Sequence, residues 1–501
     1  MPATAETTAL TEEQKAIVTR ALAGESLRVL ALAGTGKTST LVAIANAVPA
    51  RGLYLAFNRA IAEEARRKFP RHVLVKTAHA LAFASFGRHF QHQGRIENST
   101  WALRQAILER YGSALSGIAG SQKLSNSSFA VLSTLNAFLS SAAPRVSLDH
   151  VPLDSHADAA ATAQVTQTIF EAMTNRDESF PTNHDAYLKA WALTTPQLPC
   201  NILYFDEAQD ANPVLLDLVQ RQTHVQRVWV GDENQAIYSF RLATNALQSL
   251  DLPAYPLTQS WRFGPKVAKI ANAILWAKDE TLRVRGRPDR DDRVVVKSEG
   301  HLPNVVLART NAGLFEEAVA LLPRLQPMDR IAFVGGLDEV NNMVLAAYDL
   351  CAKGRTKHPG FRFFRKWGEL QSIVENGQGG EFGPFVKLVE RHGDAIPAMS
   401  QALKAAAVAD ECLARVVFST VHRYKGKEAP IVRLAGDFPE FCGFNRKTRR
   451  YEFRFEEANL AYVAVTRAER ILDLEQYLPT LLSSIEHRKR LFGPARDHAP
   501  A

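Results

Sequence analysis

The segment ALAGTGKT, residues 31–38, has the residue types of a loop that binds phosphate. It lies between an apolar run, RVLAL, and a stretch of helix-forming composition, TSTLVAIANAV, so the loop should join a strand to a helix. In that geometry the backbone N–H groups face the phosphates, Lys37 reaches the outer phosphates, and Thr38 binds magnesium. Gly34 and Gly36 supply backbone freedom near the phosphates.

Two carboxylates form a second candidate element. The apolar run ILYF is followed directly by Asp206 and Glu207. This order suits one carboxylate to binding magnesium and its neighbour to activating water. Taken alone, an Asp-Glu pair after a strand is more often a surface turn. Together with a phosphate loop, it predicts a site that hydrolyses a nucleoside triphosphate, with Asp206 as a metal ligand and Glu207 as the base.

Short apolar runs rich in β-branched or aromatic residues must position these side chains. Such runs are typical of buried parallel strands, and helical patterns such as NRAIAEEARRKF lie between them. The sequence therefore predicts an α/β chain with two parallel-sheet cores. The predicted strands lie in RVLALAG, GLYLAF, HVLVKT, NILYFDE, RVWVGD, PNVVLART, DRIAFVGG and ARVVFSTVH.

Each core is expected to be interrupted by a mainly helical insert, which could be packing decoration alone. We expect the first core to combine residues 1–79 and 196–260, with an insert over 80–195. The second core combines 261–336 and 413–492, with a shorter insert over 337–412. Residues 493–501 are expected to be a disordered tail.

Composition restricts the class of protein. The formal net charge of +8 on 501 residues favours a polyanionic partner, or only a solvated surface. The four cysteines lie far apart, which argues against a zinc, iron-sulfur or dithiol site, and we expect reduced, mostly buried thiols. The sequence has neither a signal peptide nor an apolar run of about 18 residues. It predicts a cytoplasmic protein, nucleoid-associated and of bacterial type, without a membrane partner.

Nine segments, in order, resemble the motifs of the UvrD/Rep branch of superfamily 1 helicases. In that family alanine commonly replaces the first glycine of the loop, so Ala31 fits. The resemblance implies two RecA-like parallel-sheet domains, each with a helical insert, and ATP with Mg²⁺ as cofactors. The nine segments are LTEEQ (the Q motif), ALAGTGKT (I), AFNRAIAEE (Ia), KTAHALA (Ic), FDEAQD (II), VGDENQAIYSFR (III), LTQSWRF (IV), TVHRYKGKE (V) and NLAYVAVTRAER (VI).

Within the family, the chain is most similar to the helicase region of the F-box DNA helicases, through YLAFNRAIAEEA, VLSTLNAFLSS, TNHDAYLKAW, LARTNAGLF and FVGG. Because the chain begins at the Q motif, we expect no F-box and no ubiquitin-ligase partner. Three positions depart from the family pattern. Ser39 stands where an arginine is common, and Lys427 and Ala429 take positions of motif V that are usually apolar. The insert before motif V is also shorter than in UvrD or Rep.

The resemblance implies roles at an ATP site between the two cores, where the charge on the leaving γ-phosphate must be neutralised. Arg262 and Arg467 match two arginine fingers, and Gln235 matches the residue that senses the γ-phosphate. Glu428 matches a carboxylate near the ribose or γ-phosphate, with a structural salt bridge as the alternative. The other implied nucleotide contacts are Gln14 and Trp261 at the adenine, and the loop residues Ala31, Leu32, Ala33, Gly34, Thr35, Gly36, Lys37, Thr38 and Ser39.

Single-stranded DNA is bound by aromatic faces and by donors to phosphate. Phe240 matches the aromatic residue on which a base stacks. Two basic-aromatic stretches outside the motifs, residues 360–367 and 444–455, either hold nucleic acid or form a solvated face whose aromatic residues pack inward. The remaining implied DNA contacts are Phe57, Asn58, Thr77, His79, Tyr238, Thr420 and His422.

The sequence thus predicts an ATP-dependent single-stranded DNA translocase and helicase with 3′-to-5′ polarity, acting at single-strand/duplex junctions in DNA repair or recombination. One alternative is an ATP-driven remodeller that strips recombinase filaments or other proteins from DNA with little unwinding. Another is a DNA-binding scaffold that ATP only switches, although Glu207, Arg262 and Arg467 argue against it. RNA stays open as a substrate, because only the 2′-OH distinguishes the two strands.

Overall fold

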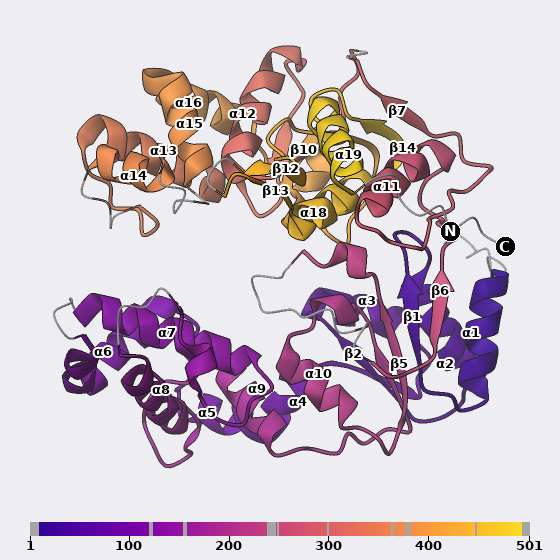
Figure 1. Cartoon of the computed structure of the whole chain (residues 1–501), viewed down its shortest axis with the longest axis vertical. Helices are drawn as coiled ribbons and strands as arrows, with labels where there is room; N and C mark the ends of the chain where they lie inside the picture. The colour runs from indigo at the N-terminus through magenta and orange to yellow at the C-terminus, as the bar shows by residue number, and fades with distance from the viewer. Residues whose placement is uncertain are drawn as a thin grey trace. The chain divides into compact units, whose positions relative to one another are not determined.

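The computed structural model describes residues 10–119, 124–153, 158–237, 247, 250–297, 300–361, 364, 366–375, 380, 382–445 and 448–492 (Figure 1). The expected tail, 493–501, lies outside them. The chain divides into two units, one of Met1–Ala31 and Gly36–Leu257, the other of Leu32–Thr35 and Thr258–Ala501. Each unit contains a six-stranded parallel sheet, which confirms the predicted fold class.

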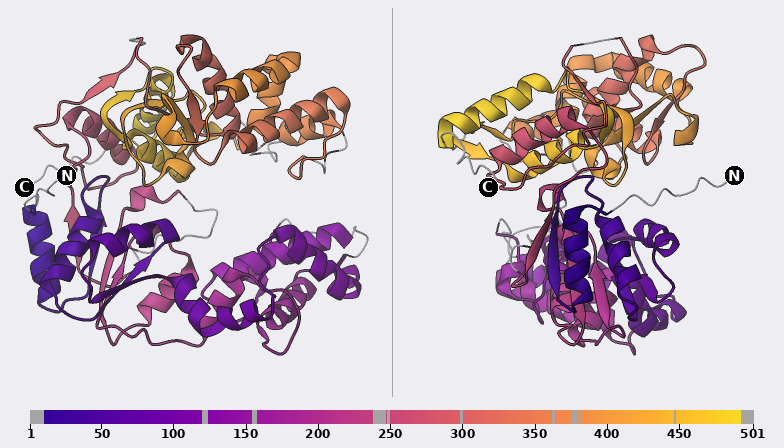
Figure 2. Two further views of the ribbon diagram at one scale, coloured as in Figure 1. Left: turned by 180° about the vertical axis from the view of Figure 1, so that it is seen from behind. Right: turned by 90° about the vertical axis from the view of Figure 1, so that its right-hand side faces the viewer.

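The sheet of the first unit has the strand order β3-β2-β4-β5-β1-β6. Helices cover both of its faces (Figure 2) because the strands are apolar on both sides. The strands are β1 (Leu27–Ala31), β2 (Gly52–Ala56), β3 (Val73–Thr77), β4 (Ile202–Phe205), β5 (Gln226–Gly231) and β6 (Ala254–Leu257). One face packs α1 (Glu12–Leu22), α2 (Lys37–Ala47) and α3 (Arg59–Lys68), and the other packs α4 (Ala78–Ala82), α9 (His184–Leu193) and α10 (Pro213–Gln220).

Between β3 and β4 the chain is helical within the described residues. Three of these helices surround a hydrophobic cluster that is separate from those on the sheet and includes Ile107, Leu135, Phe138 and Met173. This region therefore has a core of its own. The three helices are α6 (Thr100–Ala119), α7 (Leu124–Ser140) and α8 (Ala159–Thr174).

The sheet of the second unit has the order β7-β14-β11-β8-β10-β9. Its strands are β7 (Arg293–Val295), β8 (Val305–Ala308), β9 (Ile331–Phe333), β10 (Val416–Thr420), β11 (Ala429–Leu434) and β14 (Ala468–Asp473). An antiparallel hairpin of β12 (Cys442–Asn445) and β13 (Arg450–Phe453) follows β11. The other helices of the sheet region are α11 (Pro265–Ala277), α12 (Asn311–Leu321), α17 (Val421–Tyr424), α18 (Phe455–Val465) and α19 (Leu478–Phe492).

Four helices lie between β9 and β10, and they have no separate core among the described residues. Their apolar side chains join one cluster with sheet residues such as Val306, Phe333 and Phe418. This part of the chain is therefore packed onto the second sheet. The helices are α13 (Leu337–Lys353), α14 (Trp367–Glu375), α15 (Gly383–His392) and α16 (Ile396–Ala406).

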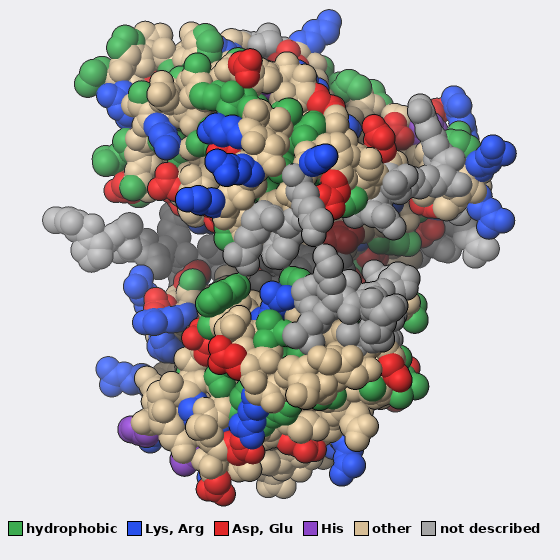
Figure 3. All heavy atoms as spheres, turned by 90° about the vertical axis from the view of Figure 1, so that its left-hand side faces the viewer, with side chains coloured by type: hydrophobic (Ala, Val, Ile, Leu, Met, Phe, Trp, Pro, Cys, Tyr) green, Lys and Arg blue, Asp and Glu red, His purple; other side chains and the backbone are tan. Residues whose placement is uncertain are grey.

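Two surface properties bear on the sequence predictions. The prediction of mostly buried thiols is wrong, because Cys351 and Cys412 are exposed and only Cys442 is buried. Cys351 lies on the exposed side of α13, whose other side packs into the core through Val344 and Leu350, and Cys412 lies in the short exposed turn Glu411–Leu413. Basic and acidic side chains are interleaved on each unit over the face in Figure 3. Over the described ranges, no helix is long and apolar enough to span a bilayer.

Candidate functional site

The phosphate loop leaves β1 and ends at the first turn of α2, as predicted. Gly34 and Gly36 have φ angles of +74° and +81°, which glycine adopts without steric cost. Gly36 is the N-cap of α2 and offers no side chain to its first turn. Within the described part of the chain, the N–H groups of Lys37, Thr38 and Ser39 have no hydrogen-bond acceptor. These donors and the positive end of the helix dipole fit a phosphate.

The ammonium group of Lys37 lies 2.7 Å from Oε2 of Glu207. Burial lowers the pKa of Lys37, but the carboxylates of Glu207, Asp206 and Asp232 outweigh that effect, so the pKa is raised above its usual value. The lysine therefore stays positively charged at the start of α2, beside the free N–H groups.

Asp206 is held at both oxygens. Its Oδ2 accepts a hydrogen bond of 2.7 Å from the Tyr54 hydroxyl, and its Oδ1 accepts one of 2.8 Å from the Glu207 N–H. The side chain is buried, and burial together with the charge of Glu207 raises the pKa of its carboxyl. A buried carboxylate of fixed orientation is favourable for a divalent cation, which would offset the cost of its charge.

Glu207 has a strained backbone. Its φ and ψ are +50° and +40°, in the left-handed region, which costs a residue with a side chain about 1–2 kcal/mol. Such strain persists where the surrounding structure requires one geometry, and it clusters at functional sites. The conformation therefore supports a chemical role for the Glu207 carboxylate.

A series of hydrogen bonds leads from Glu207 to Gln235. The Gln209 Nε2 donates to Oε2 of Glu207, and the Gln209 Oε1 accepts a hydrogen bond of 3.0 Å from the Asp232 N–H. Oδ2 of Asp232 then accepts a bond of 2.6 Å from the Gln235 amide. Because Lys37 contacts the same Glu207 oxygen, the series joins the phosphate loop to the segment that follows β5.

Gln14, expected to read adenine, is buried and hydrogen-bonded at both ends of its amide. Its Oε1 accepts from the Thr11 N–H, and its Nε2 donates to the Thr40 hydroxyl, each at 3.0 Å. The same hydroxyl donates to the Gly36 carbonyl at 3.0 Å. Thr40 thus connects the Q motif to the phosphate loop and sets the orientation of Gln14.

Replacing Thr40 by valine should remove both of these hydrogen bonds and leave the Gln14 amide without its acceptor. We expect the free energy of unfolding to fall by about 1–3 kcal/mol and the preference for ATP over GTP to weaken. Urea unfolding and the two KM values measure these effects. Thr40→Ser keeps the hydroxyl and should resemble the wild type in both measurements. If Thr40→Val also resembles the wild type, Thr40 does not connect Gln14 to the phosphate loop.

In the second unit, the Arg262 guanidinium donates hydrogen bonds to residues of the same unit. Its Nε donates to Oε2 of Glu428, and its NH1 donates to the Thr466 carbonyl at 3.0 Å. The salt bridge weighed for Glu428 is therefore present. Arg467 is 2% exposed and donates to the carbonyls of Val463 and Lys427 at 2.9 and 3.3 Å. The roles of both arginines toward phosphate stay predictions.

Trp261, expected to stack on adenine, has a cation beside its ring. The Arg287 guanidinium lies 5.8 Å from the ring centroid and is ion-paired with Asp289. Arg287 is thus a candidate nucleotide contact that sequence analysis missed.

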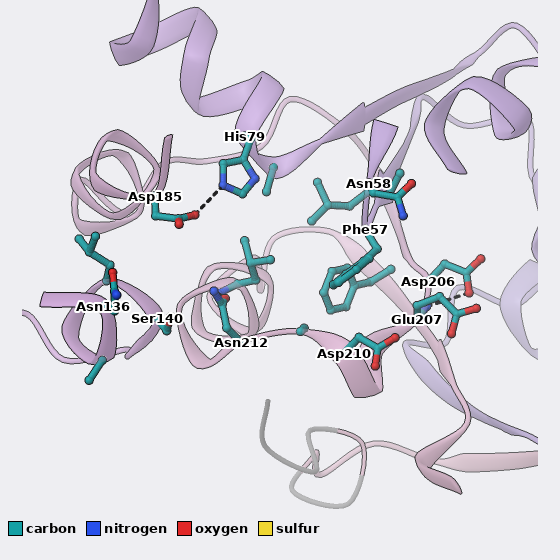
Figure 4. A pocket seen from close by; sticks show the side chains of 18 of the residues that line it. Phe57, Asn58, His79, Asn136, Ser140, Asp185, Asp206, Glu207, Asp210 and Asn212 are labelled. Atoms are coloured by element: carbon teal, nitrogen blue, oxygen red, sulfur yellow. Dashed lines mark hydrogen bonds and ion pairs between the residues drawn. The ribbon is translucent and has the colours of Figure 1, made fainter. Parts of the chain in front are cut away.

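A cavity of about 790 Å³ in the first unit brings several of the expected DNA contacts together (Figure 4). Phe57 and His79 line it, and His79 Nε2 lies 3.0 Å from Oδ1 of Asp185. Glu207 lines the same cavity, which therefore reaches the hydrolytic residues. Its far wall comes from α7, through Asn136 and other residues.

Asn58, which also lines the cavity, and Thr77 serve as helix caps. Asn58 accepts from the Ile61 N–H at the start of α3, and Thr77 accepts from the Ala80 N–H at the start of α4. Thr420 and His422 lie at the carboxyl end of β10, where the Thr420 side chain makes no capping bond. Tyr238 and Phe240 lie outside the described residues.

The structure shows what surrounds the three residues that depart from the family pattern. Ser39 is exposed in the first turn of α2. Lys427 extends to Glu411, with 2.8 Å between Nζ and Oε2, so an ion pair replaces apolar packing there. Ala429 is buried, and its N–H donates to the Arg467 carbonyl at 3.1 Å.

Sequence analysis missed several residues that hold the site together. Gln209 and Asp232 lie inside motifs II and III, so their polar character next to predicted strand ends could have identified them. Tyr54 and Thr40 lie in a predicted strand and a predicted helix, and no local signal marks their distant partners.

Two family models, two curated relatives and one solved structure match this chain. Residues 10–251 match a family model described as the UvrD/REP helicase N-terminal domain, and residues 394–476 match the UvrD-like helicase C-terminal domain. The chain is 32% identical to F-box DNA helicase 1 of Gallus gallus, over 97% of this chain and 51% of that protein. It is 31% identical to F-box DNA helicase protein 1 of Schizosaccharomyces pombe, over 95% and 58%. The chain thus spans just over half the length of these curated relatives. A solved complex of the arterivirus nonstructural protein 10 helicase with DNA covers 94% of this chain and 65% of that chain, with a TM-score of 0.33 and 11% identity.

Proposed function

Because the chain belongs to the UvrD/Rep helicase family, we propose that it is an ATP-driven translocase that moves along single-stranded DNA and separates duplexes. The observation that carries the proposal is the hydrogen-bonded series from Lys37 through Glu207 to Gln235. It connects the proposed hydrolytic carboxylate to motif III, which in the family stacks on a base. The 3′-to-5′ polarity and a place in DNA repair or recombination are parts of the same proposal.

The residues present fit ATP with Mg²⁺. Lys37 and the free N–H groups at the start of α2 would hold the phosphates, and Thr38 with the fixed carboxylate of Asp206 would hold the metal. ATP, when bound, supplies the phosphoanhydride bond whose hydrolysis drives movement. Glu207 would accept the proton of the attacking water.

The charge that develops on the γ-phosphate has to be neutralised by cations. Lys37 provides one in the first unit, and we assign Arg262 and Arg467 of the second unit to the same task. Both arginines lie among carbonyl and carboxylate acceptors that hold the guanidinium groups in place. Product release would then return the two units to their initial state, so that each cycle advances the strand.

Unwinding of partial duplexes tests the direction of movement. A duplex with a 3′ single-stranded tail should be separated in the presence of ATP and Mg²⁺, whereas the same duplex with a 5′ tail should stay intact. Separation of only the 5′-tailed substrate would contradict the proposed polarity. Separation of neither, with ATP hydrolysis intact, would favour the second candidate function.

The second candidate is a remodeller that removes recombinase filaments or other proteins from DNA with little unwinding. It is favoured by α13–α16, which share their core with the second sheet and are not built as an independent subdomain. A comparison of filament displacement with strand separation under identical ATP turnover would distinguish the two functions. Efficient unwinding of long naked duplexes would rule the remodeller out.

A further inference from the structure

The two basic-aromatic stretches differ in the structure. In the first, Phe361 is fully buried and packs against Phe382, so this stretch contributes to the core. In the second, the side chains of Phe444, Tyr451 and Phe455 are 49%, 43% and 60% exposed. Inward packing therefore describes Phe361 of the first stretch. In the second stretch only Phe453 packs inward, on the buried Phe441, while the other three aromatic rings are exposed.

The second stretch contains the β12–β13 hairpin, which lies against α19 (Figure 1). Phe444 and Tyr451 are paired directly across the two strands, with ring centroids 5.3 Å apart. The Tyr451 ring also packs on His487 of α19, again at 5.3 Å. These contacts hold both rings in place while leaving much of each exposed. A ligand that binds them would therefore pay little ordering entropy.

The hairpin is also positively charged. Arg449, Arg450 and Arg454 are exposed, and within the described ranges none of them forms an ion pair. The single acidic residue between positions 444 and 455 is Glu452, whose carboxylate is already hydrogen-bonded inside the hairpin. The arginines are therefore available to an anionic ligand beside the exposed rings.

The topology of the sheet shows at which edge the connection to the hairpin begins. Parallel strands end at the same edge, so the connection that leaves β11 starts at the edge where Thr420 ends β10. One strand, β8, separates β10 from β11, which puts these two strands about 10 Å apart. A nucleic acid strand held at Thr420 could thus continue onto the hairpin.

We propose that the β12–β13 hairpin is a contact surface for single-stranded DNA, with Phe444 and Tyr451 stacking on bases. The three arginines bind phosphates of the same strand. Exposed rings beside unpaired cations match a single strand, which offers both base faces and phosphates. In a duplex the base faces are stacked inside the helix, and an apolar protein surface offers no anion for the arginines. The inference rests on the proposed function, which makes DNA the ligand of this chain.

Salt dependence tests the phosphate contacts. In the full chain, R449A/R450A should weaken binding of a dT oligonucleotide. It should also reduce the slope of log affinity against log salt concentration by about 1.4, because each lost contact to a single strand removes about 0.7. The matched control K404A/R415A removes two exposed cations of the same unit outside the hairpin. An unchanged slope in R449A/R450A, or an equal change in the control, would overturn the inference.

A second pair of variants tests the stacking. F444L/Y451L removes the rings but keeps apolar cover over α19, and F444Y/Y451F keeps the rings. The leucine variant should bind the dT strand about thirtyfold more weakly, because both stacking rings are lost. Its preference for that strand over an abasic strand of equal length should narrow by the same factor, while the ring-preserving variant should match the wild type. Thermal unfolding shows whether each variant folds. If F444L/Y451L does not fold, the single variant F444L is used in its place.

The outcomes separate this inference from the proposed function. If the wild type binds no dT strand, the proposed function itself fails. If the wild type binds it and both the arginine and the leucine variants bind equally well, only the role of the hairpin is wrong. A loss of blunt-duplex binding with intact strand binding would also overturn the inference, because the surface would then serve duplex DNA.

Discussion

Replacing Lys37 by alanine is expected to lower the turnover of ATP in saturating single-stranded DNA by about a thousandfold, while binding of the strand persists. Lys37 is the cation at the start of α2, and its charge is maintained by Glu207, Asp206 and Asp232. Its loss leaves the phosphates without their nearest positive charge. ATPase assays and strand-binding measurements on the same preparation separate the two effects.

A matched control for this variant is Lys68→Ala. Lys68 is an exposed lysine of the same unit whose ammonium group pairs with Glu64 on α3. A surface pair of this kind contributes little to stability, so turnover should be unchanged. Undiminished turnover in K37A would refute the assignment of the loop, and equal losses in both variants would indicate a general effect of removing a lysine.

Replacing Arg262 by alanine is expected to lower turnover by about a thousandfold or more, the usual contribution of an arginine finger. Because Arg262 is ion-paired with Glu428, the loss could also come from breaking that pair. Glu428→Gln separates the two explanations, since it removes the ion pair and keeps the guanidinium. It should cost far less turnover than R262A.

Single-turnover ATP hydrolysis in the two variants measures the chemical step directly. Equal losses of the hydrolysis rate in R262A and E428Q would mean that Arg262 acts only through its salt bridge with Glu428. A large loss in R262A alone supports its role toward the γ-phosphate. Binding of single-stranded DNA should stay intact in both variants, because neither residue is assigned to the strand.

Most strands of the two sheets could be predicted because they are short, apolar and buried on both faces. The edge strand β6 was missed, since Ala254–Leu257 contains Pro256 and is half exposed. The strand β7 was missed for a similar reason, because it is only three residues long and begins with an exposed arginine. Edge strands lack the continuous apolar signal of buried ones. The internal strands β11 and β14 were missed as well, because Pro430 and Arg433 interrupt the apolar run of β11, and Glu469 and Arg470 that of β14.

The hydrolytic residues could be predicted because local sequence carries them: a loop before a helix for Lys37, and a strand end for Asp206 and Glu207. The residues that orient them could not be predicted in the same way. Tyr54 contacts Asp206 from a position 152 residues away, and only the folded sheet brings the two together. The same holds for Asp185 beside His79, which are 106 residues apart.

The most direct test is the rate of ATP hydrolysis by the wild-type chain with Mg²⁺, measured without nucleic acid and with single-stranded DNA, blunt duplex DNA or RNA. We expect turnover to rise and saturate with single-stranded DNA, and to rise much less with duplex or RNA. Turnover near zero on saturating single-stranded DNA would contradict the proposed function. It would favour the alternative of a DNA-binding scaffold whose conformation ATP switches without hydrolysis.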